Sequence, residues 1–222
     1  MPAWVEPVLQ GLTYWLGYQR ELYPHWDLTE GALAAEAVRL MTTHRLVENG
    51  TKQRVYLEVP YSALGHPPEG RRSGDRLDIL LTTRDVKSRD AFKLASRTRP
   101  HARVAIEVKR SRESTRRLAA DVEGLLRISA ACPSCRTFLL LVGEAGPRNK
   151  LSWVLNLPAK KAVTAKRVVV GTWSRRRPTE FEQKLSKGGV RVVKRRLCMA
   201  APAWNSKGTH WAGLFEVLRV RK

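Results

Sequence analysis

The chain alternates between segments of helical periodicity and short apolar runs of strand periodicity. Apolar residues recur three and four positions apart over Ala3–Leu22 and again over Glu30–His44, which predicts two amphipathic helices. Ser114 is a favourable N-cap, and the apolar stripe after it predicts another helix that reaches about Ala131. Each of these helices has one apolar face, so we expect them to cover a sheet.

Short apolar runs between the helices predict the strands of that sheet. Residues 76–81 and Val104–Lys109 alternate between apolar and polar side chains, as a strand with one buried face does. Arg54–Tyr61 has a similar pattern, whereas Thr137–Val142 lacks alternation and predicts a strand buried on both faces. The order is helix, three strands, helix and strand, and its last strand–helix–strand unit predicts a right-handed crossover. We therefore expect an α/β protein whose mixed sheet is flanked by helices.

The last third of the chain is also patterned. A capping box at residues 179–182 predicts a short helix that ends near Gly188. Strands are predicted in four further segments: Leu151–Leu155, Lys166–Trp173, Val190–Leu197 and Trp211–Val220. We expect a core over residues 1–150 and a basic C-terminal extension with additional strands over residues 151–222, packed together as one structural domain.

The net charge of the chain indicates what kind of partner the protein binds. Lys and Arg number 41 and Asp and Glu number 20, so the formal net charge is 41 − 20 = +21. An excess of this size, in a chain with 43% hydrophobic residues, predicts a folded protein that binds a polyanion, most often nucleic acid. No apolar run approaches the length of a membrane span, and Glu6 and Pro7 interrupt the apolar stretch at the N-terminus. We expect no membrane association and a cytoplasmic location.

Two further classes of protein, NTPases and disulfide-rich proteins, lack their characteristic motifs in this sequence. The sequence has no phosphate-cradling glycine motif followed by Lys-Ser or Lys-Thr, which argues against an NTPase. Its three cysteines do not make a disulfide framework.

Candidate chemistry lies on two of the predicted strands. Glu107 and Lys109 point to the same face of the second strand, because side chains alternate along a strand. On the first strand, Leu77 and Ile79 point to the face opposite Asp78. If the strands pair antiparallel, Asp78 lies beside Glu107 and Lys109 at one end of the sheet. Two carboxylates with an adjacent ammonium favour a Mg²⁺ site that acts on phosphate. The alternative is a solvent-facing cross-strand charge pair with Asp78 as a turn residue.

The two strands together resemble the PD-(D/E)XK nuclease superfamily. The resemblance lies in Asp78, within Arg-Leu-Asp-Ile, and in Glu107-Val108-Lys109 on the next strand; Leu77 replaces the usual proline. It implies a restriction-endonuclease-like αβββαβ core and Mg²⁺-dependent cleavage of DNA, with Mn²⁺ able to substitute. It also implies that Asp78, Glu107 and the Val108 carbonyl hold the metal, and that Lys109 positions the attacking water. In-line attack would leave a 5′-phosphate and a 3′-hydroxyl.

An acidic residue on the helix before the first strand often joins the site in this superfamily. Glu30 and Glu36 are the two candidates, and the sequence does not separate them. Otherwise Glu30 is a favourable helix start and Glu36 a solvated flank.

Basic clusters supply the expected contacts with DNA. The connection between the two site strands and the C-terminal extension are both rich in arginine and lysine, which predicts sequence-independent phosphate contacts. The residues expected to bind nucleic acid are Arg84, Lys87, Arg89, Lys93, Arg97, Arg175, Arg176, Arg177, Lys194, Arg195 and Arg196. The alternative for these segments is a solvated basic surface.

The predicted function is therefore that of a Mg²⁺-dependent DNA endonuclease that acts on double-stranded or branched DNA. A homodimer or a protein partner is compatible with this prediction. Another possibility is a non-catalytic DNA- or RNA-binding protein or subunit that keeps a nuclease-like fold. A basic ribosome-associated or RNA-binding protein, in which the Glu-x-Lys pattern is fortuitous, is a further alternative.

Overall fold

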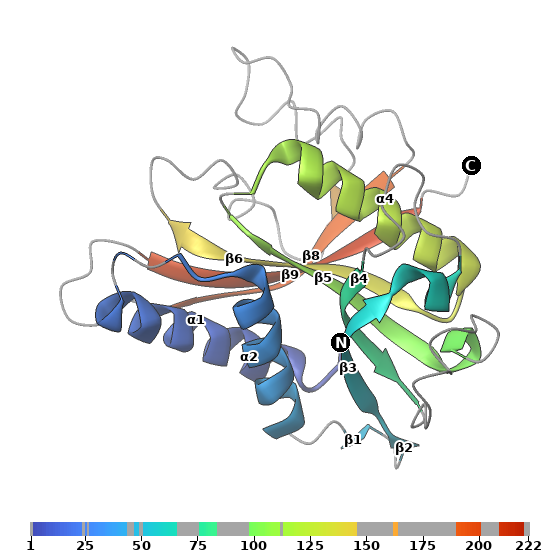
Figure 1. The fold of residues 1–222 in the computed structure, drawn as a ribbon, viewed down its shortest axis with the longest axis horizontal. Helices are drawn as coiled ribbons and strands as arrows, with labels where there is room; N and C mark the ends of the chain where they lie inside the picture. Colours follow the sequence, from blue (N-terminus) through green and yellow to red (C-terminus); the bar gives the residue numbers. More distant parts are fainter. Residues whose placement is uncertain are drawn as a thin grey trace.

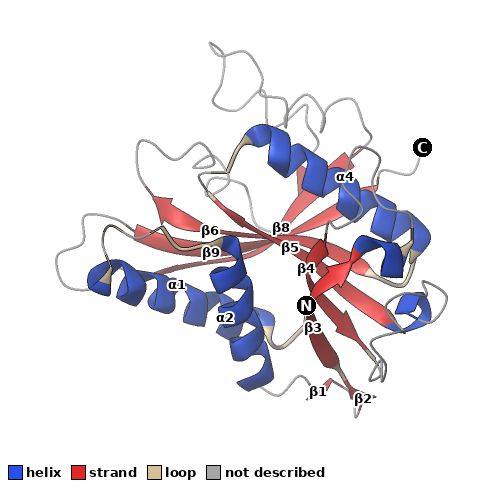
Figure 2. Cartoon of the chain, viewed as in Figure 1, coloured by secondary structure: helices blue, strands red, loops and turns tan. Residues whose placement is uncertain are grey.

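The computed structural model describes residues 2–23, 25, 27–43, 47–48, 51–65, 76–83, 98–111, 113–145, 162–163, 190–200 and 209–219. These residues form a mixed α/β fold around one large sheet with the strand order β3-β4-β5-β6-β9-β8-β7. The helices lie on both faces of this sheet (Figure 2).

The bounds of the helices agree closely with the sequence patterns. They are α1 (Val5–Leu22), α2 (Glu30–Thr43) and α4 (Thr115–Ala131), with short 3-10 turns η1 (Tyr61–Leu64) and η3 (Arg99–His101). The Ser114 side chain accepts a hydrogen bond from the N–H of Arg117, so it caps α4 as predicted. The strands of the large sheet are β3 (Arg54–Pro60), β4 (Arg76–Thr82), β5 (Ala102–Arg110), β6 (Arg136–Ala145), β7 (Ala162–Val163), β8 (Val190–Ala200) and β9 (Thr209–Arg219). Two further short strands, β1 (Val47–Glu48) and β2 (Thr51–Lys52), pair with each other.

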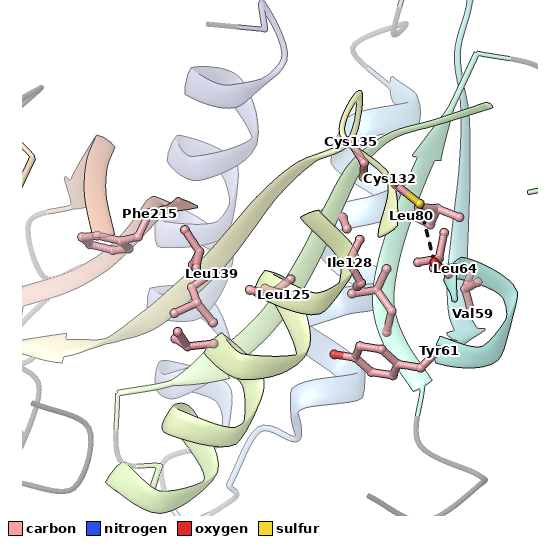
Figure 3. Close-up of a cluster of buried hydrophobic side chains, with 14 of the residues drawn as sticks. Val59, Tyr61, Leu64, Leu80, Leu125, Ile128, Cys132, Cys135, Leu139 and Phe215 are labelled. Atoms are coloured by element: carbon pink, nitrogen blue, oxygen red, sulfur yellow. Dashed lines mark hydrogen bonds between the residues drawn. The ribbon is translucent and has the colours of Figure 1, made fainter. Parts of the chain in front are cut away.

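Two layers of apolar side chains bury the two faces of the sheet. Helices α1 and α2 cover one face and α4 covers the other (Figure 1). The buried cluster under α1 and α2 includes Leu12 and Leu33 from the helices and Ile106 from the sheet. The cluster under α4 includes Leu125 and, from the sheet, Leu139 (Figure 3). Thr137 to Val142 are all buried, which confirms that this segment of β6 is covered on both faces.

The middle of the chain builds the central strands. β3, β4 and β5 pair antiparallel in sequence order, and β6 pairs parallel with β5 after the crossover through α4. One detail of the strand alternation is wrong: Leu77 packs with Leu80 in the α4 cluster, whereas Ile79 and Leu81 lie in the opposite cluster. The regular alternation of β4 is therefore lost near Asp78, at the start of the strand.

The C-terminal strands continue the same sheet. β9 pairs antiparallel with β6, and β8 pairs antiparallel with β9. Predicted strands at 190–197 and 211–220 correspond to these two. The other predicted elements of this part, at 151–155, 166–173 and 179–188, lie outside the described residues.

The three cysteines are buried free thiols. Cys132 and Cys135 lie at the turn between α4 and β6, and the Cys132 thiol donates to the carbonyl of Leu64 at 3.6 Å (Figure 3). Among the helices of the described residues, none is both long and apolar enough to cross a bilayer.

Candidate active site

The two site strands meet in the predicted antiparallel register. Ile79 pairs with Ile106, so one further step along the same register places Asp78 opposite Glu107. The pairing of β4 with β5 ends at Ile79 and Ile106. Beyond this point a side chain of β4 contacts the backbone of β5: the N–H of Val108 donates to Asp78 Oδ2 at 2.7 Å. A carboxylate is therefore held by main chain at the point where β4 and β5 separate.

Lys109 is the centre of the charged cluster. Its side chain projects from β5, and only 7% of the residue is exposed. The distances from its Nζ are 2.9 Å to Glu30 Oε2, 3.7 Å to Glu107 Oε2, 3.7 Å to Asp121 Oδ2 and 3.9 Å to Asp78 Oδ2. These carboxylates come from α2, β5, α4 and β4. The structure thus brings Asp78, Glu107 and Lys109 together, as the sequence predicts.

The structure separates the two candidate glutamates of α2. Glu30, in the first turn of the helix, makes the shortest contact with Lys109. Glu36 instead accepts two hydrogen bonds from Arg39, at 2.8 Å from Nε and 2.7 Å from the terminal nitrogen. Since α2 turns between these positions, Glu30 joins the cluster and Glu36 does not.

Asp121 is a member of the cluster that we did not identify from the sequence. It lies on α4, which covers the sheet face opposite to α1 and α2, and it is 6% exposed. A signal was present, because Asp121 follows Leu118 by three positions and precedes Leu125 by four. A charged residue on the buried stripe of a helix is rarely left without a partner.

Glu107 is the most deeply buried carboxylate of the cluster, with 2% of the residue exposed. The Tyr61 hydroxyl donates to Glu107 Oε1. Burial raises the pKa of Glu107 well above its usual value, and the nearby charges of Asp78 and Asp121 raise it further. Lys109 and Tyr61 act in the opposite direction. Tyr61 could not be predicted from a sequence pattern, because its contact with Glu107 arises only when η1 packs near β5 in the tertiary structure.

The charges of Lys109 and Glu30 are linked. Burial disfavours the ammonium form, but the surrounding carboxylates outweigh burial and raise the pKa of Lys109, which therefore stays protonated. Burial also raises the pKa of Glu30, against the effect of Lys109. The cluster therefore holds an excess of acidic groups around one cation.

The cluster gathers carboxylate oxygens from four residues around one point. Carboxylate oxygens are the ligands that Mg²⁺ prefers, and like charges packed this closely favour a cation between them. Within the part of the chain that is described, no three residues of the types His, Cys, Asp and Glu are placed to hold a metal ion in this arrangement. The cation between the carboxylates is the Lys109 ammonium, which lies where they converge.

Three of the residues predicted to bind nucleic acid lie on β8, an inner strand of the sheet. Lys194 is 7% exposed and burial lowers its pKa, so this side chain is not available for the surface contact expected of it. Arg195 donates from Nε to Glu216 at 2.5 Å, and Arg196 is paired with Glu6. Contacts of these two arginines with phosphate stay a prediction. The other predicted contacts lie outside the described residues: Arg84, Lys87, Arg89, Lys93, Arg97, Arg175, Arg176 and Arg177.

Comparison of the chain with protein-family models finds no match, and neither do comparisons with curated proteins and with solved structures. The geometry of the charged cluster and the charge of the chain are therefore the observations that bear on function.

Proposed function

We propose that this protein is a metal-dependent DNA endonuclease of the PD-(D/E)XK type. The observation that carries the proposal is the convergence of Glu30, Asp78 and Glu107 on Lys109 at one end of a sheet. Each of these groups comes from a segment where the resemblance expects it: the helix before the first strand of the core, the R-x-D strand and the E-x-K strand. A chance Glu-x-Lys pattern on a solvated strand would not bring carboxylates from α2 and β4 onto a buried lysine.

The order and pairing of the central elements support the same proposal. The segment from α2 to β6 runs helix, three strands, helix and strand, with an antiparallel β3-β4-β5 unit and a parallel β5–β6 pair. This order is the one that a restriction-endonuclease-like core requires. Strands β8 and β9 extend the sheet beyond that core.

The side chains of the cluster have complementary roles in the proposed reaction. Asp78, Glu107 and the Val108 carbonyl would hold Mg²⁺ or Mn²⁺. When bound, the ion supplies Lewis-acid polarisation of the phosphodiester. The Lys109 ammonium positions the attacking water and offsets the negative charge that develops on the phosphate. Glu30, at 2.9 Å from Nζ, orients that ammonium. In-line attack by water breaks the P–O3′ bond, and the products are a 5′-phosphate and a 3′-hydroxyl.

DNA is the proposed substrate because of the charge of the chain. A net charge of +21 favours a polyanionic partner and gives binding that weakens as salt is added.

The test is cleavage of supercoiled, single-stranded and branched DNA by the purified chain with Mg²⁺ or Mn²⁺. Asp78→Ala and Lys109→Ala should each lower the rate by at least about 100-fold, because each removes a group that acts on the reacting phosphate. Glu30→Gln and Glu36→Gln form a matched pair on one helix: the first should impair cleavage and the second should not. Circular dichroism checks that each variant is folded. Failure of the wild type to cut any of these substrates with either metal would refute the activity.

A second candidate is a non-catalytic nucleic-acid-binding subunit with the same fold. The observation in its favour is that Lys109 already balances part of the carboxylate charge from within the chain. This candidate expects DNA binding that is unchanged in Asp78→Ala, with no cleavage by the wild type.

A further inference from the structure

Next to the charged cluster, two arginines from different elements converge on one exposed carboxylate. A terminal nitrogen of Arg110 lies 2.8 Å from Asp27 Oδ1, and one of Arg20 lies 3.7 Å from the same oxygen. The arginine side chains are 25% and 18% exposed, whereas that of Asp27 is 68% exposed. The two arginine side chains are therefore packed against the rest of the protein, and the Asp27 carboxylate contacts them from the solvent side.

The position of this arginine pair relates it to the proposed active site. Arg110 directly follows Lys109 at the end of β5, and Asp27 precedes Glu30 by three residues. Arg20 lies in the last turn of α1. The pair therefore lies at the same end of β5 as Lys109.

A small hollow adjoins the two arginines. Its volume is about 30 Å³, and Arg20 and Arg110 line it together with Leu28, Leu33, Ser111 and Gly143. A space of this size holds about two water molecules. A phosphate at the position of the Asp27 carboxylate would contact both arginines.

The energetics favour such an exchange. Ion pairs that involve an exposed side chain contribute only about 0–1 kcal/mol, so each of these two contacts of Asp27 is weak. Guanidinium groups bind phosphate oxygens through short, charge-assisted hydrogen bonds that are stronger than neutral ones. Displacement also leaves two positive charges facing a phosphate, where Asp27 now neutralises one of them.

We propose that Arg20 and Arg110 form a phosphate-binding subsite for the nucleic-acid strand, and that Asp27 occupies it in the free protein. This inference rests on the proposed function, because it assigns the subsite to a phosphate that neighbours the one cleaved. The ligand is a phosphate group, which a strand supplies either as a terminal 5′-phosphate or as an internal phosphodiester.

Binding of short single-stranded oligonucleotides to the full chain, in the presence of a chelator, tests the subsite without cleavage. Fluorescence anisotropy would compare a 5′-phosphorylated oligonucleotide with its 5′-hydroxyl counterpart. Arg110→Gln and Arg20→Gln should each weaken binding by about tenfold and lower the salt slope by about one. Arg39→Gln is the matched control, since Arg39 is an exposed arginine paired with Glu36, and should change binding much less.

Asp27→Asn gives the result that separates a subsite from a structural ion pair. Loss of a competing carboxylate should tighten binding by about three- to tenfold, whereas loss of a structural contact would leave it unchanged or weaken it. Asp27 is exposed, so this variant is expected to fold even if an arginine variant does not.

Each outcome has a definite meaning. If the arginine variants affect only the 5′-phosphorylated oligonucleotide, the ligand is the terminal phosphate; if they affect both, it is an internal phosphodiester. The subsite is refuted if Asp27→Asn fails to tighten binding, or if Arg110→Gln behaves like Arg39→Gln. These binding results do not depend on cleavage, so the proposed activity can fail while the subsite holds, and the reverse.

Discussion

Glu107 is the residue whose charge the fold disfavours most in the cluster. It is almost completely buried, it receives a hydrogen bond from Tyr61, and it lies beside Lys109 and two other carboxylates. Burial is the largest cause of its raised pKa. The native protein therefore keeps the proton of Glu107 at a pH where the unfolded chain, with an ordinary pKa near 4.5, has lost it.

This difference predicts how stability depends on pH. The contribution of Glu107 to the free energy of unfolding is fully present below about pH 4.5 and is lost as the pH rises through the raised native pKa. Within that window, one linked proton changes the free energy of unfolding by up to about 1.4 kcal/mol per pH unit. Urea unfolding in a chelator, over a series of pH values, should show this slope in the wild type but not in Glu107→Gln. Added Mg²⁺ should stabilise the wild type more at high pH, because the ion competes with the proton. Parallel curves for the two proteins would contradict the assignment.

At the scale of single residues, the sequence predicted the site residues whose positions follow from regular strand geometry. Alternation along β5 and the antiparallel register of β4 with β5 were enough to predict that Asp78, Glu107 and Lys109 come together, although the alternation of β4 itself is lost near Asp78. Tyr61 and Asp121 were not found, because their contacts depend on how η1 and α4 pack on the sheet. The choice between Glu30 and Glu36 also needed the direction of α2, which the sequence alone does not give.

At the scale of elements, the end of β5 and the adjacent part of β6 are packed closely. The N–H of Ser111 donates to the carbonyl of Val142 at 2.8 Å. A Cβ atom added to Gly143 would lie 2.4 Å from the Cβ and 2.0 Å from the Oγ of Ser111. These contacts are too short for real atoms, so a glycine is needed where the turn after β5 crosses β6.

Gly143→Ala should therefore lower the free energy of unfolding by about 1–3 kcal/mol through overpacking. The double variant Ser111→Gly with Gly143→Ala removes both close contacts and should recover most of the loss, as a double-mutant cycle can measure. Gly31→Ala is the control, because its added Cβ meets only the Thr29 hydroxyl at 3.9 Å. This helical substitution should be neutral or stabilising by up to about 1 kcal/mol. Equal effects of the two single variants would show that the contact with Ser111 is unimportant.

Element boundaries followed the sequence where local signals were strong. The start of α2 at Glu30 and the Ser114 cap of α4 are examples. The change of face at Leu77 could not be read from the sequence, because the apolar residues from Leu77 to Leu81 fit a regular strand alternation.

At the scale of the whole molecule, the sheet takes strands from both ends of the chain. β9 covers the edge of β6 that would otherwise be open, and it contributes the buried side chains of Trp211 and Phe215. A segmentation of the sequence at residue 150 could not show this pairing, because contacts between strands about 70 residues apart leave no local pattern. The described strands of the basic extension, β7, β8 and β9, are therefore part of the sheet, and β8 and β9 contribute to its hydrophobic core.

A chain that ends at residue 150 should fail to fold cooperatively, since it exposes the β6 edge and loses these aromatic side chains. Size-exclusion chromatography and thermal unfolding would show an aggregated or unfolded product. In the full chain, Phe215→Ala should cost about 3–5 kcal/mol in a single unfolding transition. Met199→Ala, on the adjacent strand but 53% exposed, should cost less than about 0.5 kcal/mol. A stable, monomeric 1–150 fragment would show that the extension is dispensable.

The position of the Lys109 ammonium has a consequence for how the protein matures. Because an amino group of the chain itself already lies among the acidic side chains, folding does not have to wait for an ion from the medium. A newly made chain can reach its native state where free magnesium is scarce, and chelation should not unfold it, unlike a domain built around structural zinc. Under the proposed function, uptake of the catalytic ion would then be a later and separate step.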